Sequence, residues 1–375
     1  MSRAPHPTDL EPVSLDEHRW FYVGGQRVQH NGEHYVDGAA YVECYVPEVV
    51  RSRWPMVLVH GGVQTGTNFV ATPDGRRGWL HDFLRAGFPV YILEQPERGR
   101  SGHALTHGGN GDTRTLVRYS QERIVERFTA SSTRALWPQA VDHTQWPGSG
   151  LPGDHVFDNF FASQVEMLAD RTEIEILARD AGCALLDQIG PAVLLTHSQS
   201  GPFGWLIADQ RPSLVKALLS IEPNGPPFYE VEFSGGTDWY RYSSELARPY
   251  GITRAPLNYA DLPAGETPEH GRCGDRPETP GLVPGFQQAA PPRKLPNLAG
   301  VPILIATAEA SYHATYDHLT SRFLHEADVA HTFMRLADHG LTGNGHMVML
   351  EQNSHEVADL LIRWLDAEVD GLWKD

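Results

Sequence analysis

The stretch that decides the fold is Ala192-Val193-Leu194-Leu195-Thr196-His197-Ser198-Gln199-Ser200-Gly201. Its first four residues form a short continuous apolar run, which is typical of a parallel strand covered on both faces. Residues 202–210 then predict a helix. The turn between them therefore joins a buried strand directly to a helix and presents Ser198 at the edge of the sheet.

Ser198 stands where a nucleophile stands on a strand-to-helix turn of this kind. In such a nucleophile elbow, the residues two before and two after the nucleophile must be small, because strand and helix nearly touch there. These positions hold Thr196 and Ser200 instead of the usual glycines. Ser200 is small, whereas Thr196 departs from the pattern. We take Ser198 as the candidate nucleophile, the alternative being a serine that only caps the helix.

Similar apolar runs recur on both sides of this turn. Strands alternating with helices indicate βαβ units, and hence a mostly parallel central sheet with helices on both faces. Two further strands are expected earlier in the chain, with turns at Gly24-Gly25 and Asp37-Gly38. The predicted strands are 20–23, 41–46, 56–59, 90–93, 192–195, 215–221, 302–307 and 331–336, and the other predicted helices are 78–86, 160–186, 312–327 and 351–368.

The chain divides into a short N-terminal part and a long core. Residues 1–55 hold an irregular lead-in, to about residue 18, and the first strands of the sheet, and residues 56–375 form the core. Two insertions rich in glycine and proline interrupt the core at about 95–158 and 223–300. Irregular segments of this length inside a compact domain are usually functional, so we expect both to form a lid.

Aromatic residues gather in the second insertion. They suggest an apolar, ring-bearing substrate, although the same residues would equally well form the lid's own core. The residues concerned are Phe228, Tyr229, Trp239, Tyr240 and Tyr242.

His60-Gly61-Gly62 ends the first buried strand of the core. Acyl transfer needs backbone N–H groups aimed at the developing oxyanion. On this architecture one donor follows the nucleophile, at Gln199, and the other comes from the loop after the strand, at Gly62. The alternative is a plain glycine turn.

The general base and the acid are chosen by their order along the chain. Histidine is the natural base near neutral pH, and the expected order is serine, acid, histidine. We prefer His346, just before the last helix, to His339, which follows the last strand more closely. For the acid we prefer Glu222, which ends the predicted strand 215–221, to Glu309, which follows the next strand.

Composition limits the partners. The formal net charge of −17 over 375 residues repels phosphate backbones and anionic lipid, so neither nucleic acid nor a membrane is expected. Three widely spaced cysteines without a metal-ligand spacing, together with an N-terminus lacking an apolar segment, predict reduced thiols and a cytoplasmic protein. No metal and no organic cofactor are expected. The cysteines are Cys44, Cys183 and Cys273.

Several stretches, in this order over about residues 55–370, resemble the α/β-hydrolase esterases related to bacterial esterase 713. The resemblance implies Ser198 as nucleophile, His346 as base and Glu222 as the orienting acid. It implies oxyanion N–H groups from Gly62 and Gln199, and it suggests a homodimer. The stretches are His60-Gly61, Thr72-Pro73-Asp74-Gly75-Arg76, Arg98-Gly99-Arg100-Ser101, His197-Ser198-Gln199-Ser200-Gly201, Glu222-Pro223 and Gly343-Asn344-Gly345-His346-Met347.

The expected reaction is hydrolysis of a small-molecule carboxylic ester through an acyl-enzyme intermediate. A lactonase or an amidase would use the same residues. A dehalogenase or an epoxide hydrolase would need a carboxylate at position 198. The alternative that is not an enzyme is a ligand-binding protein with a hydrolase fold.

Overall fold

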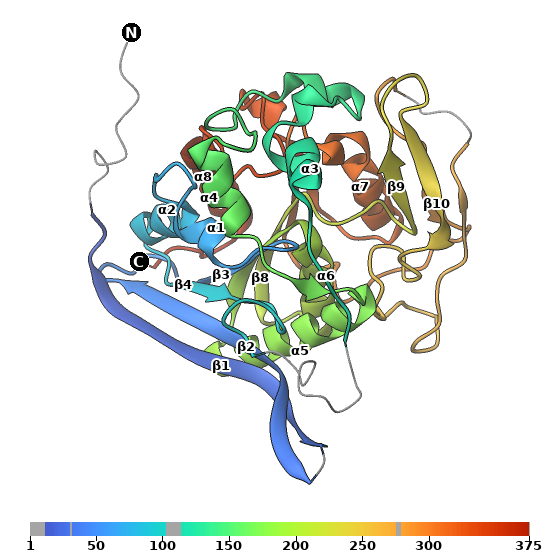
Figure 1. Ribbon diagram of the computed structural model, residues 1–375. Coiled ribbons are helices and arrows are strands. Elements are labelled where there is room, and N and C mark those ends of the chain that lie inside the picture. The colour runs from blue at the N-terminus through green and yellow to red at the C-terminus, as the bar shows by residue number, and fades with distance from the viewer. Residues whose placement is uncertain (1–11, 31, 103–113, 275–278, 375) are drawn as a thin grey trace.

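The computed structural model describes residues 12–30, 32–102, 114–274 and 279–374. An eight-stranded sheet forms the centre of the molecule (Figure 1), in the order β1-β2-β4-β3-β7-β8-β13-β14. The last six strands in this spatial order, β4-β3-β7-β8-β13-β14, run parallel to one another, as the short apolar runs predict. They are β3 (Met56–Val59), β4 (Val90–Leu93), β7 (Ala192–His197), β8 (Val215–Ile221), β13 (Ile303–Thr307) and β14 (Thr332–Arg335).

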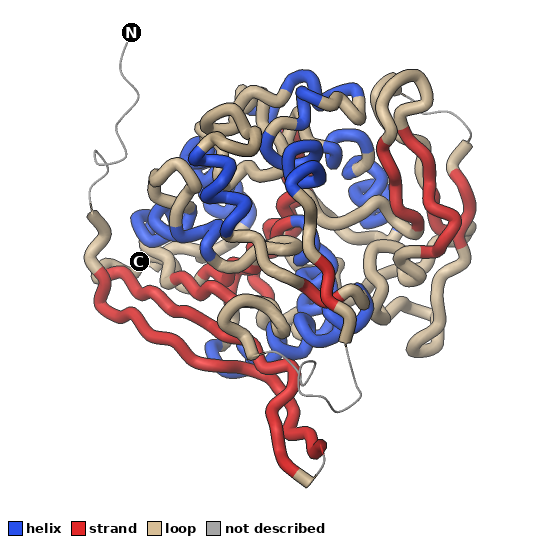
Figure 2. The backbone as a smooth tube through the Cα atoms, in the orientation of Figure 1, coloured by secondary structure: helices blue, strands red, loops and turns tan. Residues whose placement is uncertain are grey.

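The sheet is buried on both faces because alternate residues of each strand enter two different hydrophobic clusters. In β3, Met56 and Leu58 belong to one cluster, whereas Val57 and Val59 belong to the other. Side chains of α2, α4 and α8 complete the first cluster, and those of α5 and α6 the second, so helices lie on both sides of the sheet (Figure 2). These helices are α2 (Trp79–Ala86), α4 (His155–Ala162), α5 (Arg171–Ile189), α6 (Gly201–Gln210) and α8 (Ser354–Glu368).

The N-terminal strands form a long antiparallel hairpin, β1 (Leu15–His30) and β2 (Glu33–Pro47), whose far end projects from the body (Figure 1). The predicted turns at Gly24-Gly25 and Asp37-Gly38 are wrong. Gly24 pairs with Ala39 inside the hairpin. Gly24 and Gly25 have φ values of +65° and +79°. Glycines in this left-handed region let a strand bend without ending, so the glycine signal marked a bend.

The predicted helix 160–186 is two helices, and the predicted helix 312–327 is also divided. Between α4 and α5 the chain forms β6 (Met167–Leu168), which pairs with β5 (Leu116–Val117). Asp170 then caps α5 by accepting hydrogen bonds from the N–H groups of Thr172 and Glu173, which explains the new helix start. The second helix consists of η5 (Tyr312–Thr315) and α7 (Asp317–Glu326).

The described parts of the two insertions contain short regular elements. The first holds α3 (Gln121–Ile124), a π-helical turn η1 (Val125–Thr129) and the 3₁₀ turns η2 (Ser131–Thr133) and η3 (Pro138–Asp142). The second holds two antiparallel pairs, β9 (Tyr229–Phe233) with β10 (Tyr240–Leu246) and β11 (His270–Arg272) with β12 (Phe286–Gln288). The remaining short elements are α1 (Thr67–Val70), η4 (Ser198–Ser200) and η6 (Leu336–His339).

Candidate active site

Ser198 lies at the turn between β7 and α6, with a φ of +56°. This left-handed backbone is strained for a residue with a side chain, and such strain clusters at functional sites. Ser200 secures the turn because its hydroxyl donates to the carbonyl of Val59 on β3, at 2.8 Å, and accepts from the N–H of His197, at 2.8 Å. Ser198 is partly exposed, while Ser200 is fully buried. The turn therefore presents one hydroxyl, that of Ser198.

Thr196 is accommodated by glycines on the helix side of the turn. A Cβ atom on Gly204 of α6 would lie 3.1 Å from Cγ2 of Thr196 and 2.7 Å from Cδ1 of Leu218. A Cβ atom on Gly201 would lie 2.6 Å from Cα of Pro223. The space that the elbow needs thus comes from Gly201 and Gly204, so strand and helix still approach closely despite the threonine.

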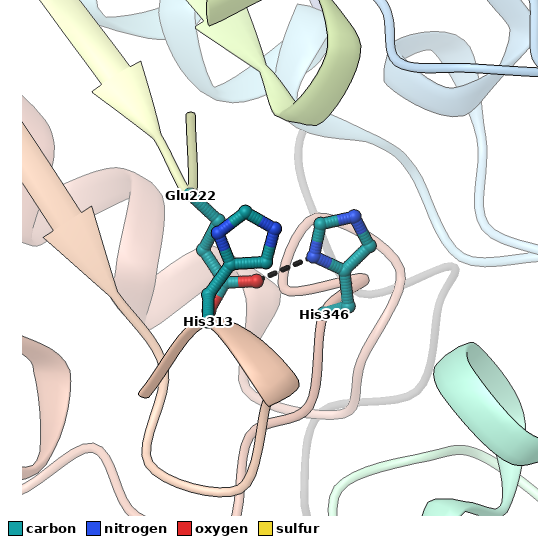
Figure 3. Close-up of side chains that lie close together, drawn as sticks. All are labelled: Glu222, His313 and His346. Atoms are coloured by element: carbon teal, nitrogen blue, oxygen red, sulfur yellow. Dashed lines mark hydrogen bonds and ion pairs between the residues drawn. The ribbon is translucent and has the colours of Figure 1, made fainter. Parts of the chain in front are cut away.

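His346 and Glu222 come together from distant parts of the chain (Figure 3). Nδ1 of His346 lies 2.5 Å from Oε2 of Glu222. Glu222 follows β8 with a φ of +46°. Its carboxylate also accepts hydrogen bonds from the N–H of Ala308, at 2.9 Å, and the hydroxyl of Ser311, at 2.8 Å. Ala308 and Ser311 therefore fix the carboxylate of Glu222, and this carboxylate orients the imidazole of His346.

The imidazole of His346 is enclosed by other rings. It stacks on Phe128, with ring centroids 5.2 Å apart, and on His313, with centroids 4.8 Å apart and planes 9° apart. Nε2 of His346 lies 3.2 Å from the hydroxyl of Tyr312, and Nε2 of His197 lies 3.0 Å from the backbone carbonyl oxygen of His346. The ring is therefore fixed in position before any substrate binds.

Burial shifts the ionisation of both partners. It lowers the pKa of His346 well below the usual value, and the nearby His197, His313 and Arg127 lower it further. Burial raises the pKa of Glu222, and Asp317 adds to the rise, whereas the hydrogen bonds from Ala308 and Ser311 oppose it. Both shifts disfavour the charged forms, the imidazolium of His346 and the carboxylate of Glu222, and the two groups titrate as a coupled pair.

The loop after β3 passes directly against the turn that holds Ser198. A Cβ atom on Gly61 would lie 3.2 Å from Cβ of Ser198, and one on Gly62 would lie 3.3 Å from Oε1 of Gln199. Gly62 and Gln199 line the same cavity as Ser198 and His346. The residues predicted to supply the oxyanion N–H groups are thus neighbours of the candidate nucleophile.

Arg98 braces this loop, and the sequence did not single it out as a functional residue. Its side chain is fully buried and donates to the carbonyls of Gly61 and Gln64, at 3.3 and 3.2 Å, and to Oε1 of Gln199, at 3.3 Å. Burial lowers the pKa of Arg98 to about 9. The one signal in the sequence was its place in Arg98-Gly99-Arg100-Ser101, a stretch that carries the esterase resemblance.

The two competing residues lie outside the His346–Glu222 pair. His339 is exposed at the end of η6. Glu309 accepts a hydrogen bond from the N–H of Gly343, at 2.7 Å. It therefore contacts the loop that carries His346 and not the imidazole itself.

The cavity at Ser198 has a volume of about 300 Å³, at the small end of ligand pockets. Within the described part of the chain, none of the five insertion aromatics noted in the sequence lines it. Phe228 is fully buried, and Trp239, Tyr240 and Tyr242 pack against the core. The cavity at Ser198 is lined instead by polar, charged and other aromatic side chains, including Tyr119, Arg123, Arg127, Arg171, Asn224, Glu230, Arg254, Tyr312 and Tyr316.

Three buried side chains, Glu222, His313 and His346, have potential metal-ligand atoms within 4.8 Å of one another. The Nδ1 atoms of both histidines already take part in hydrogen bonds to carboxylates. Nδ1 of His346 faces Glu222, and Nδ1 of His313 lies 2.9 Å from Asp317. The arrangement thus has the form of two neighbouring histidine–carboxylate pairs, of which only the first reaches the cavity at Ser198.

Comparisons with known proteins agree with this architecture. No family model matches the chain. A protein named probable secreted lipase phiG, from Fungal sp. (strain ATCC 74256), is 39% identical over 376 residues, covering 97% of this chain and 93% of that protein. A solved structure described as a novel bacterial esterase has a TM-score of 0.64 at 20% identity, covering 96% of this chain and 98% of that one.

The prediction of a cytoplasmic protein is contradicted, because this relative is named as a secreted protein. No disulfide joins the described cysteines Cys44, Cys183 and Cys273. Large domains commonly fold without disulfides, so reduced thiols do not identify the compartment. Among the described helices, none is long and apolar enough to span a membrane.

The solved structure shares the fold, with its mostly parallel sheet covered by helices. The lipase relative matches over nearly the whole chain. This chain belongs to the α/β-hydrolase family of esterases and lipases.

Proposed function

We propose that this protein hydrolyses carboxylic esters with Ser198 as nucleophile, His346 as general base and Glu222 as the acid that orients the base. The observation that carries the proposal is the 2.5 Å contact between His346 and Glu222 beside a cavity that Ser198 lines from a strained turn. Nucleophile, acid and base (Ser198, Glu222 and His346) then stand in the chain order of this fold.

The mechanism follows from these positions. As Oγ of Ser198 attacks the ester carbonyl carbon, Nε2 of His346 takes its proton, and Glu222 stabilises the imidazolium that forms. The N–H groups of Gly62 and Gln199 bind the oxyanion. His346 then protonates the leaving alcohol, which leaves an acyl-enzyme. A water molecule, deprotonated by the same histidine, releases the carboxylic acid and restores Ser198.

We also propose that the insertions at about 95–158 and 223–300 form the cap of a core that spans residues 56–375. The support is the cavity lining, which draws Arg127 from the first insertion and Arg254 from the second. Residues 103–113 and 275–278 of these insertions lie outside the described part of the chain.

A homodimer remains a proposal as well. Its support is β1, an edge strand of 16 residues, with Trp20 63% and Tyr22 49% exposed. Long edge strands with exposed apolar side chains favour pairing with another chain. Light scattering would show a mass near 83 kDa for a dimer, twice the 41.6 kDa of the chain, and a mass near 42 kDa would reject it.

The test of the proposed function is a panel of short-chain esters, lactones and amides with wild type and Ser198→Ala. Ester turnover that disappears in Ser198→Ala supports the proposal. Faster turnover of lactones or amides would move the assignment to a lactonase or an amidase with the same residues. No turnover by a folded wild-type protein would favour a ligand-binding role.

A further inference from the structure

The cavity at Ser198 is rich in positive charge, although the chain as a whole carries a formal net charge of −17. Four guanidinium groups line it, from Arg123, Arg127, Arg171 and Arg254. Glu230 is the one carboxylate in the described lining. Its Oε1 already accepts hydrogen bonds from Arg248 and Arg254, at 2.8 and 2.9 Å. Arg171 also lowers the pKa of Glu230, but only through space and without an ion pair between described atoms, so one carboxylate faces four lining guanidinium groups.

Arg123, Arg127 and Arg171 pack on neutral groups. Arg123 lies over the ring of Tyr119 at 4.1 Å, and Arg127 lies 5.1 Å from the ring centre of Tyr312. Within residues 12–30, 32–102, 114–274 and 279–374, the ion pairs at the cavity join Glu230 to Arg248 and Arg254, and none involves Arg123, Arg127 or Arg171. Uncompensated cations in a cavity of low dielectric attract an anion strongly.

Arg127 is close to the reacting groups. Its guanidinium faces Tyr312, whose hydroxyl lies 3.2 Å from Nε2 of His346. Arg171 comes from the first turn of α5, and one of its amino groups lies 3.4 Å from Sδ of Met167. An anion that bridged Arg127 and Arg171 would therefore share the cavity with the bond to be cleaved.

The pKa of Tyr119, which also lines the cavity, is lowered by the same arginines. Burial alone would raise the pKa of its hydroxyl, yet Arg123, Arg171 and Arg127 together hold that pKa below the ordinary value. The three cations thus more than offset the effect of burial on this hydroxyl. An oxyanion of the substrate would benefit from the same three cations.

We propose that the natural substrate is an ester that also carries an oxyanion, a carboxylate or a phosphate, which Arg127 and Arg171 bind while Ser198 attacks the ester. This inference rests on the proposed function and names its substrate class. It replaces the apolar substrate that the insertion aromatics suggested, since those aromatics lie outside the described lining. The competing explanation is that the arginines only support the cap through contacts with aromatic rings.

The experiment compares two esters of similar size, 4-nitrophenyl hydrogen glutarate, which is charged, and 4-nitrophenyl pentanoate, which is neutral. The ratio of their kcat/KM values is measured for wild type, Arg127→Gln, Arg171→Gln and the control Arg134→Gln. Arg134 belongs to the same insertion, but its side chain is 60% exposed and it does not line the cavity. Glutarate and inorganic phosphate are tested in parallel as inhibitors of pentanoate hydrolysis.

We expect wild type to prefer the charged ester, and each cavity variant to lower the charged-to-neutral ratio by about tenfold or more, the effect of one charge-assisted contact. The loss should appear mainly in KM for the charged ester, and Arg134→Gln should keep the wild-type ratio. Competitive inhibition by glutarate alone identifies a carboxylate site, and inhibition by phosphate alone identifies a phosphate site.

Three results separate this inference from the proposed function. First, pentanoate turnover could depend on Ser198 while the wild-type ratio of kcat/KM for the charged ester to that for the neutral ester is one or less. That result rejects the anion site and supports the esterase activity. The anion site is also rejected if both cavity variants reduce turnover of the two esters equally. If neither ester is cleaved, binding of glutarate or phosphate is measured by calorimetry with wild type and Arg127→Gln. Binding that is weaker in the variant then supports the anion site alone, and absence of binding rejects it.

Discussion

The carboxylate of Glu222 lies 2.5 Å from Nδ1 of His346, whereas the other acid in the permitted chain order, Glu309, binds the backbone N–H of Gly343 at 2.7 Å. A carboxylate that orients a catalytic imidazole must contact it directly. The geometry therefore favours Glu222, and the choice can be tested with two matched substitutions.

Glu222→Gln should lower kcat by about 10²–10⁴, because the imidazolium loses its charged partner and the imidazole can adopt the wrong tautomer. Glu309→Gln retains an acceptor for Gly343 and should lower kcat by less than about tenfold. Steady-state kinetics on one ester measure both, with thermal melting to confirm that each variant is folded. A crippled Glu309→Gln beside a nearly normal Glu222→Gln would reverse the assignment.

The pH profile should reflect the burial of His346. A neighbouring carboxylate by itself raises the pKa of a histidine, but burial, His197, His313 and Arg127 lower it here. The base is active when unprotonated, so kcat/KM should rise with pH and level off. The midpoint should fall below the ordinary histidine value of about 6.5. Stopped assays between pH 4 and 9, a range set around about 6.5, measure it. A midpoint above that value would contradict the expected effect of burial.

Arg98 should act through the position of the oxyanion loop. Arg98→Lys keeps a charge but cannot bind the carbonyls of Gly61 and Gln64 and the amide of Gln199 together. We expect kcat to fall by about 10–100-fold, as for a group displaced from its working geometry, with KM little changed. Arg100→Lys is the control, because Arg100 binds Glu94 and Glu43 and does not line the cavity at Ser198. Equal losses in both variants, or a loss confined to stability, would argue against this role.

Gly204 should be intolerant of a side chain. The Cβ atom of Gly204→Ala would lie 2.7 Å from Leu218 and 3.1 Å from Thr196, and overpacking of this kind costs about 1–3 kcal/mol. Urea denaturation measures the free energy of unfolding. Gly300→Ala, whose Cβ would meet nothing within 4 Å, should change it by less than about 0.5 kcal/mol. Equal stability of the two variants would show that the elbow has more space than the structure indicates.

The central sheet was readable from the sequence because parallel strands buried on both faces appear as short apolar runs. All residues of β3, β4, β7 and β13 are buried, which is why these strands were located. The break between α4 and α5 was missed because it depends on the pairing of β6 with β5. The paired residues Val117 and Met167 are far apart in the sequence. Local patterns do not carry such pairings.

Chain order narrows the candidate site, but it does not predict contacts between remote residues. The order of elements points to Ser198 and leaves Glu222 or Glu309 as the acid and His346 or His339 as the base. The role of Arg98 depends on contacts with Gly61 and Gln199, on other loops. The arginines of the cavity come from both insertions and α5, and no local pattern in the sequence predicts that these segments meet.

The most direct test of the central claim is labelling with an active-site serine phosphonate, followed by peptide mass spectrometry. We expect a single adduct on Ser198, formed fast in wild type and very slowly in His346→Ala, because the histidine activates the hydroxyl. Ser198→Ala should bind no phosphonate, lose roughly 10⁴ or more in kcat and melt near the wild-type temperature. An adduct on another serine, or none on a folded protein that cleaves esters, would contradict the assignment of Ser198 as the nucleophile.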